Sequence, residues 1–328
     1  MSFWRNCAYF AGAFVGTAAG LYAIVPRDPA FIDRALAERA TCEVLVVGPS
    51  YIEGFKPDTF DDESKRVGLG LRSCKLSAPG LQGPELRYVL GRTLRHPWPK
   101  LRYVVIDITL GDGMNFPRVN WFQERVIAWH VVGMLPWLLD HYRRSGYDRL
   151  RGNAGELWAH VKHYALNYFG LGRGAALLQG IRLVDRLART SEQVAEAARV
   201  VTRPSRPDAR EGYELRLAHL IEQKAGVKPG SNSYALQLRE EVRGLGHDAL
   251  FLISPVLSTQ RPPRPGDPKD PVQVLDFEDP ARFPELYTRE VRGHTSHLTG
   301  EGGRLYSRAL ARVLLELDKR GPSERPRQ

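Results

Sequence analysis

Residues 44–50 read VLVVGPS, a short apolar run rich in β-branched residues that stops at a Gly-Pro-Ser turn. Such a run predicts a buried parallel strand that delivers Ser50 to the carboxyl edge of a sheet. In open α/β sheets the loops that follow the strands meet in a crevice at this edge, where functional groups gather. Ser50 is therefore a candidate nucleophile, provided that the chain supplies a base. A candidate base is His297, directly before the last predicted helix.

The flanking sequence predicts the opening of a doubly wound parallel sheet. Strand, loop, strand, helix and strand follow one another, and a similar pattern returns near the C-terminus. The segment 55–61 contains Pro57 and is expected to be a Pro-broken loop. The expected strands are residues 43–47, 74–77, 101–108 and 249–254, with a short apolar piece at 272–277, and the expected helices are 29–40, 84–94, 211–225, 231–245 and 301–320.

Between residues 120 and 210 the pattern is helical and rich in aromatic residues, without strand-like alternation. We therefore expect a helical insertion over the sheet, where insertions shape substrate access. The predicted organisation is an N-terminal membrane anchor (1–28), a first part of the α/β domain (29–119), the helical insertion (120–210), a second part of the α/β domain (211–320) and a disordered tail (321–328).

The composition is that of a globular protein with a basic surface. Of the 328 residues, 43% are hydrophobic and 26% are charged, and the net charge is +10. This charge favours anionic surroundings such as phospholipid headgroups, acidic polysaccharide or nucleic acid. Nucleic acid is not an expected partner, because the sequence has no helix-turn-helix, zinc-finger or aromatic RNA-binding signature. A solvated basic surface without a specific partner is the alternative.

The N-terminal segment predicts a membrane helix. Residues 7–25 are 19 uncharged residues, preceded by Arg5 and followed by Pro26. A helix of this length is just long enough to cross about 30 Å of hydrocarbon. We expect an uncleaved anchor in the cytoplasmic membrane, with the main domain outside the cytoplasm. The alternative is a signal peptide cleaved near residues 21–23, although the cleavage pattern there is poor.

Two cysteines offer a test of the compartment. Cys42 and Cys74 each lie at the beginning of a predicted strand. If the two strands are neighbours, the sulfur atoms can form a disulfide in an oxidising compartment. Two buried free thiols are the alternative.

Three short motifs occur in a characteristic order: a Gly-x-Ser after the first strand, a glycine (Gly80) after the second, and His297 before the C-terminal helix. Together they resemble the SGNH hydrolase family, in particular its exported, membrane-anchored branch of acyltransferase-like proteins that modify envelope polymers. The likeness covers about residues 43–108 and 250–319. It implies a flavodoxin-like three-layer α/β fold with a large helical insertion and an N-terminal transmembrane helix.

The resemblance also implies roles for individual residues. Ser50 would be the nucleophile, and its backbone N–H one oxyanion donor. Gly80 would supply a second backbone N–H, and Asn115 is the nearest candidate for the third donor, followed by Asn120. His297 would be the general base, since its segment is similar to the family's His-Leu-Asn-x-x-Gly. No cofactor and no metal are implied.

Two positions depart from the family pattern. The family's aspartate stands three residues before the histidine, where this chain has His294, and an imidazole cannot replace an anionic orienting group. Pro49 stands where the family usually has an aspartate. A Ser–His dyad is chemically tolerable, and a site that no longer reacts is the alternative. Candidates for a substitute acid are Asp107, Asp276, Asp279 and Glu290.

Two pairs of closely spaced histidines raise the question of a metal site. His294 and His297 are spaced so that they could bind a metal, but no cysteine or carboxylate lies beside them at ligand spacing. His160 and His163 share one face of a predicted helix among aromatic residues. We expect this face to pack against the anchor or the membrane and not to bind a metal.

The resemblance implies a function in acyl transfer to or from a hydroxyl group of a cell-envelope glycan, through an acyl-enzyme at Ser50. The expected partners are the membrane, a membrane-bound acyl carrier or acyltransferase, and an anionic glycan. One alternative is a plain esterase in which water is the acceptor. Another is a catalytically inactive protein that keeps the fold and binds envelope polysaccharide through its arginine-rich surface.

Overall fold

The computed structural model describes two compact units. One comprises residues 1–30 and 116–204, and the other comprises residues 31–115 and 205–328. The residues described are 2–24, 29–109, 127–145, 154–168, 217, 233–256, 273–294 and 297–319.

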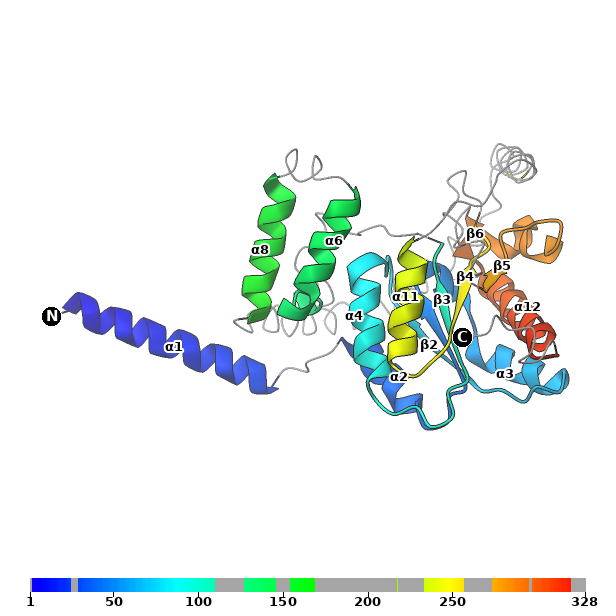
Figure 1. The fold of residues 1–328 in the computed structure, drawn as a ribbon, viewed down its shortest axis with the longest axis horizontal. Helices are drawn as coiled ribbons and strands as arrows, with labels where there is room; N and C mark the ends of the chain where they lie inside the picture. The colour runs from blue at the N-terminus through cyan, green and yellow to red at the C-terminus, as the bar shows by residue number, and fades with distance from the viewer. Residues whose placement is uncertain are drawn as a thin grey trace, which may run out of the picture. The chain divides into compact units, whose positions relative to one another are not determined.

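The larger unit is built on a five-stranded parallel sheet (Figure 1). The strands lie in the order β2-β1-β3-β4-β5, which is the order of flavodoxin-like doubly wound sheets. The predicted α/β class with a parallel sheet is therefore confirmed. The strands are β1 (Val44–Gly48), β2 (Ser73–Ser77), β3 (Tyr103–Asp107), β4 (Ala249–Ile253) and β5 (Val274–Asp276).

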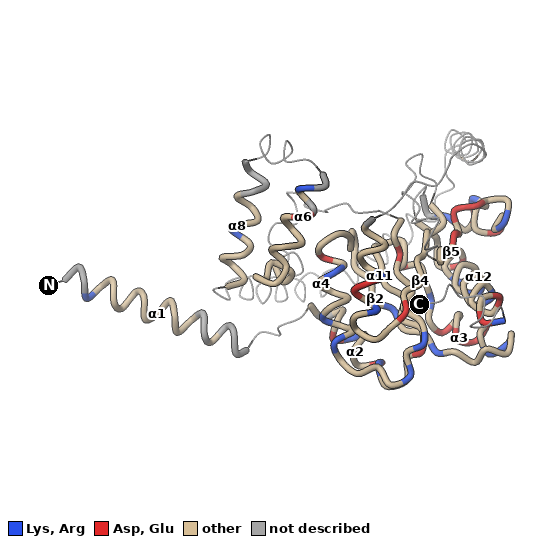
Figure 2. The backbone as a smooth tube through the Cα atoms, viewed as in Figure 1, with Lys and Arg blue, Asp and Glu red and all other residues tan. Residues whose placement is uncertain are grey.

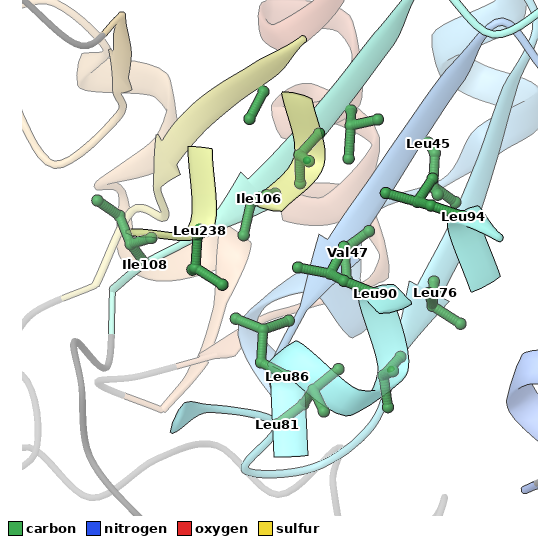
Figure 3. Close-up of a cluster of buried hydrophobic side chains, with 14 of the residues drawn as sticks. Leu45, Val47, Leu76, Leu81, Leu86, Leu90, Leu94, Ile106, Ile108 and Leu238 are labelled. Atoms are coloured by element: carbon green, nitrogen blue, oxygen red, sulfur yellow. The ribbon is translucent and has the colours of Figure 1, made fainter. Parts of the chain in front are cut away.

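Helices cover both faces of this sheet, because successive residues of each strand point to opposite sides. Leu45 and Val47 of β1 pack on one side with Leu90 of α4, as Figure 3 shows. Val44 and Val46 pack on the other side. The first layer contains α2 (Ala30–Glu38), α4 (Gly83–Leu94) and α11 (Ser233–Gly244), and the second contains α3 (Pro57–Arg66) and α12 (Gly300–Lys319).

The four main predicted strands and the short piece at 272–277 are all present. The loop expected at residues 55–61 is wrong, because α3 begins at Pro57. Proline is favoured in the first turn of a helix, where its missing N–H would have no intrahelical acceptor. The sequence also did not predict a small antiparallel hairpin of β6 (Arg292–His294) and β7 (His297–Leu298).

The described part of residues 120–210 is mainly helical. It contains a 3-10 turn, η3 (Val132–Met134), followed by α6 (Leu135–Ser145) and α8 (Ala154–Tyr168). The helix expected at 211–225, apart from residue 217, and the tail at 321–328 lie outside the described residues.

The N-terminal segment forms a single helix of 23 residues, α1 (Ser2–Ile24). Within the described residues, no helix combines the length and the hydropathy that crossing a bilayer requires. The transmembrane helix predicted for residues 7–25 is therefore not confirmed.

A disulfide joins Cys42 to Cys74. Parallel pairing of β1 with β2 sets Leu45 opposite Cys74, which brings Cys42, just before β1, close to its partner. Of the two states considered for these cysteines, the structure contains the bonded one.

The disulfide should stabilise the α/β unit, because it closes a loop with a sequence separation of 32. From loop-closure entropy we expect a loss of about 3–4 kcal/mol in the free energy of unfolding for the double variant Cys42→Ser/Cys74→Ser. Urea unfolding of the variant and of the wild-type protein measures this loss. The matched control is Cys7→Ser, which removes the exposed free cysteine and should leave stability unchanged. Equal stability of all three proteins would contradict the expectation.

Candidate functional site

The candidate nucleophile stands at the carboxyl edge of the sheet. β1 ends at Gly48, Pro49 is extended, and Ser50 opens the 3-10 turn η1 (Ser50–Gly54). A Cβ atom at Gly48 would lie 2.5 Å from Cβ of Asp107 in the neighbouring strand β3. Only glycine allows this approach, so the end of β1 can lie directly beside the end of β3. Ser50, two residues after Gly48, is half-buried.

The candidate base lies beside this serine, although the two residues are 247 positions apart in the sequence. His297 is the first residue of β7, and its Nε2 atom lies 3.0 Å from Oγ of Ser50. The His297 ring also packs beside the ring of Tyr51, with centroids 5.5 Å apart. A hydroxyl and an imidazole at this distance form the pair that activates a serine for nucleophilic attack.

Two glycines in the first turn of α12 bring β7 and η1 together. A Cβ atom at Gly303 would lie 2.1 Å from the carbonyl oxygen of Gly54, the last residue of η1. A Cβ atom at Gly302 would lie 2.1 Å from the carbonyl oxygen of Val291. Because neither position leaves room for a side chain, the helix that follows His297 packs backbone to backbone against the turn that carries Ser50.

Hydrogen bonds hold the same contact. The backbone N–H of Lys56 donates to Oγ of Ser307 at 2.8 Å, and that hydroxyl donates to the carbonyl of Gly303, also at 2.8 Å. The backbone N–H of Thr299 donates to the carbonyl of Val291 at 2.8 Å. The segment around His297 is therefore tied both to η1 and to the residues before β6.

A buried polar network lies at the ends of β3 and β4. The Asp107 carboxylate accepts hydrogen bonds from the hydroxyl of Ser254 and, at 2.7 Å, from the backbone N–H of Thr109. The backbone N–H of Ser254 donates to Oγ1 of Thr109 at 2.7 Å. The hydroxyl of Tyr306, from α12, lies 3.4 Å from Oγ of Ser254. The network thus joins two central strands to the helix that follows His297.

Burial controls the titration of this network. Desolvation raises the pKa of Asp107 to about 6, although hydrogen bonds from Ser254 and Thr109 oppose the shift. Burial and the negative charge of Asp107 raise the pKa of Tyr51 and, well above its usual range, that of Tyr306. Tyr51 lies beside His297, so the electrostatic influence of Asp107 extends to a direct neighbour of the Ser–His pair.

Of the predicted oxyanion donors Gly80, Asn115 and Asn120, only Gly80 lies among the described residues. Gly80 has φ +68°, which favours glycine, and it lies in a turn where the N–H of Leu81 donates to the carbonyl of Ala78. This turn directly follows β2, whose last residue, Ser77, pairs with Gly48. Gly80 therefore lies at the same edge of the sheet as Ser50. Asn115 and the second candidate, Asn120, lie outside the described residues.

Three further candidate acids, Asp276, Asp279 and Glu290, lie in or beside turns near the C-terminal part of the sheet. Asp276 and Asp279 each accept a hydrogen bond at 2.9 Å from the backbone N–H two residues later, so each caps its own turn. Glu290 lies exposed in a 3-10 turn. The backbone of His294 pairs opposite His297 in the β6-β7 hairpin.

A separate histidine cluster lies inside the helical insertion. His160 hydrogen-bonds through its two ring nitrogens to His130 (2.9 Å) and to the hydroxyl of Tyr142 (2.8 Å). His163 is also buried, with its ring centroid 4.8 Å from that of His130. The expectation that His160 and His163 pack against the anchor or the membrane is corrected, since both lie in the interior of the helical pair. In the described parts of the chain, no group of three or more His, Cys, Asp or Glu residues is arranged to hold a metal ion.

Several polar residues at the site were not predicted as a group from the sequence. Three of them belong to the network around Asp107, namely Ser254, Thr109 and Tyr306. The fourth, Tyr51, packs beside His297. A usable signal existed for two of them, because Thr109 and Ser254 each follow an apolar strand, as Ser50 does. Tyr306 and Tyr51 carried no comparable signal, since each lies in a helical segment among other aromatic or polar residues.

The contact between α12 and η1 yields a test with a matched control. Gly303→Ala places a methyl group against the carbonyl oxygen of Gly54, so we expect a loss of about 1–3 kcal/mol in the free energy of unfolding. Gly300→Ala, in the same helix, meets no atom within 4 Å and should be neutral or slightly stabilising. Urea unfolding of the two variants measures the difference. Equal stability would contradict the close packing.

Asp107 predicts a specific dependence of stability on pH. Its folded-state pKa of about 6 lies above the ordinary value of 3.8, so its contribution to stability is fully present below pH 3.8 and is lost as the pH rises through about 6. The loss is on the order of 3 kcal/mol. Asp107→Asn removes this titration, so the stability of the variant relative to wild type should increase across this window.

Urea unfolding at a series of pH values tests the expectation for Asp107. Asp62→Asn, at an exposed position of α3, controls for the loss of one negative charge. A difference between Asp107→Asn and wild type that does not change with pH would rule out the proposed titration.

Comparison with known proteins identifies no relative from which a role for the site could be transferred. No family model, no curated protein and no solved structure matches the chain. The chemistry of Ser50 and His297 therefore has to be inferred from their geometry and surroundings.

Proposed function

We propose that the chain is an SGNH-like esterase or acyltransferase that forms an acyl-enzyme at Ser50. The observation that carries this proposal is the 3.0 Å distance between Ser50 Oγ and His297 Nε2 at the carboxyl edge of a parallel sheet. Catalytic groups of open α/β sheets gather at this edge. The order of Ser50, Gly80 and His297 along the chain, which resembles that of SGNH hydrolases, adds support.

The chemistry of the proposed reaction has two halves. Oγ of Ser50 attacks the carbonyl carbon of an ester while His297 takes the hydroxyl proton, and the leaving alcohol receives that proton from His297. In the second half, His297 takes a proton from an acceptor hydroxyl or from water, and the acceptor oxygen attacks the acyl carbon and releases Ser50. The backbone N–H groups of Ser50 and Gly80 would stabilise the negative charge on the carbonyl oxygen.

The proposal requires only the pair formed by Ser50 and His297. Removing the third member of a triad lowers activity by a large factor without abolishing it. Pro49 and His294 stand where the SGNH family has acidic residues, and they favour a second candidate function. That candidate is an inactive SGNH-like protein that binds envelope polysaccharide during its modification.

The proposed substrates are ester groups of a cell-envelope glycan, met outside the cytoplasm. The Cys42–Cys74 disulfide supports an oxidising compartment, where such bonds persist. The net charge of +10 suits an anionic glycan. We further propose that the N-terminal segment attaches the domain to the cytoplasmic membrane, close to a membrane-bound acyl carrier or acyltransferase that supplies the acyl group.

The proposal predicts that hydrolysis of a small acetyl ester depends on Ser50 and His297 as a unit. Ser50→Ala and His297→Gln should each lower kcat/KM by several orders of magnitude, and the double variant should be no worse than either, because the two residues act in one step. Hydrolysis of p-nitrophenyl acetate by the purified full chain measures these rates.

Ser77→Ala is the matched control, since Ser77 ends the neighbouring strand at the same edge of the sheet. It should keep the wild-type rate. Activity in the Ser50→Ala protein equal to that of wild type would exclude Ser50 as the nucleophile. No activity in any of the proteins, including wild type, would favour the inactive binding protein.

A further inference from the structure

The helices α6 and α8 form a pair with its own interior (Figure 1). Tyr142 of α6 hydrogen-bonds to His160 of α8, and the side-chain amide of Asn167 donates to the carbonyl of His130 at 3.0 Å. Buried apolar residues complete the contact, among them Trp129 and Leu138. The inward faces of the two helices therefore already have their packing partners within the pair.

Each helix carries a second apolar stripe, which is exposed. On α8 the stripe is Trp158, Val161 and Ala165, at helical spacing and on the opposite side from the buried histidines. Trp158 is 66% exposed and Val161 is 50% exposed. These residues do not belong to the interior of the pair, and large apolar side chains at such exposure mark an interaction surface.

The stripe on η3 and α6 has the same character. Val132 is 75% exposed, and Leu135 and Leu139 follow it at intervals of three and four residues with exposures of 42% and 51%. Arg143, one turn further along the same side, is also exposed. Figure 2 shows that charged positions are sparse along α6 and α8.

Basic residues flank these stripes in the sequence. Residues 143–151, which link α6 to α8, read RRSGYDRLR and contain four arginines and one aspartate. The unit formed by residues 1–30 and 116–204 has 15 Lys and Arg against 8 Asp and Glu, so it carries +7 of the net charge of +10. An apolar surface next to a concentration of positive charge suits a partner that is both apolar and anionic.

We propose that the exposed stripes of α6 and α8 bind the surface of a bilayer that contains anionic phospholipid. In this arrangement the aliphatic residues and Trp158 enter the boundary between headgroups and acyl chains, where tryptophan is favoured. Arg143, exposed at the end of the α6 stripe, contacts the phosphate groups, and each basic residue near an anionic membrane contributes about 1 kcal/mol. This contact is separate from any attachment through the N-terminal segment and does not depend on the chemistry at Ser50.

Charge complementarity favours lipid over a second copy of this chain. A second copy would bring another unit with a net charge of +7 against the first, and like charges repel. An anionic bilayer instead supplies negative charge beside apolar chains. The same argument predicts that binding weakens as the salt concentration rises, because salt screens exposed charges.

A fluorescent reporter on the stripes tests this proposal in the full chain. In a Cys7→Ser background, the disulfide leaves no free cysteine, so Leu139→Cys or Val161→Cys can be labelled with bimane. We expect a blue shift of emission with vesicles of phosphatidylcholine and phosphatidylglycerol. We also expect loss of intensity when the lipids carry brominated acyl chains, and smaller effects with phosphatidylcholine alone.

Two further variants complete the experiment. Asp62→Cys, on the exposed surface of α3, is the control position and should not be quenched by brominated lipid. Leu135→Asp puts a charge on the stripe and should reduce quenching at position 161 without lowering the unfolding temperature, since Leu135 is exposed. Lack of lipid quenching at either stripe position, or equal quenching at position 62, would overturn the proposal. A blue shift that depends on protein concentration and not on lipid would instead indicate a second copy.

Discussion

The candidate site depends on one close backbone contact, that of Gly303 in α12 with Gly54 in η1. His297 belongs to a strand of only two residues, which cannot fix its own position. The first turn of α12, which follows His297, fixes the position of this strand. The same turn packs against η1, which begins at Ser50. Because both surfaces in contact are backbone, there are no flexible side chains between them, and the distance from Ser50 to His297 is set by the fold.

A second constraint is the buried polar network around Asp107, at the ends of β3 and β4. Asp107 is fully buried, and its carboxylate accepts hydrogen bonds from Ser254 and Thr109. Gly48 permits this carboxylate to lie beside the end of β1. Buried carboxyls with raised pKa values are concentrated at functional sites. In this chain Asp107 has a structural task, the joining of two strand ends, and an electrostatic effect on Tyr51, which packs beside His297.

The sequence was most informative where burial is continuous. β1, β3 and β4 are buried along their whole length, so each reads as an unbroken apolar run, and the serine at the end of β1 followed from the same pattern. The helix α3 was missed because Pro57 suggested a break and not a helix start. The β6-β7 hairpin was missed because strands of two or three residues have no measurable period. The link between Asp107 and Ser254 needs the strand order, which a single sequence does not contain.

The central claim is that His297 activates Ser50 as a nucleophile. Its most direct test is peptide mapping by mass spectrometry after the full chain has reacted with a fluorophosphonate probe. We predict one adduct, on Ser50, which forms much more slowly in His297→Gln and at the normal rate in Ser77→Ala. An adduct on another residue, or equal labelling of Ser50 with and without His297, would contradict the account.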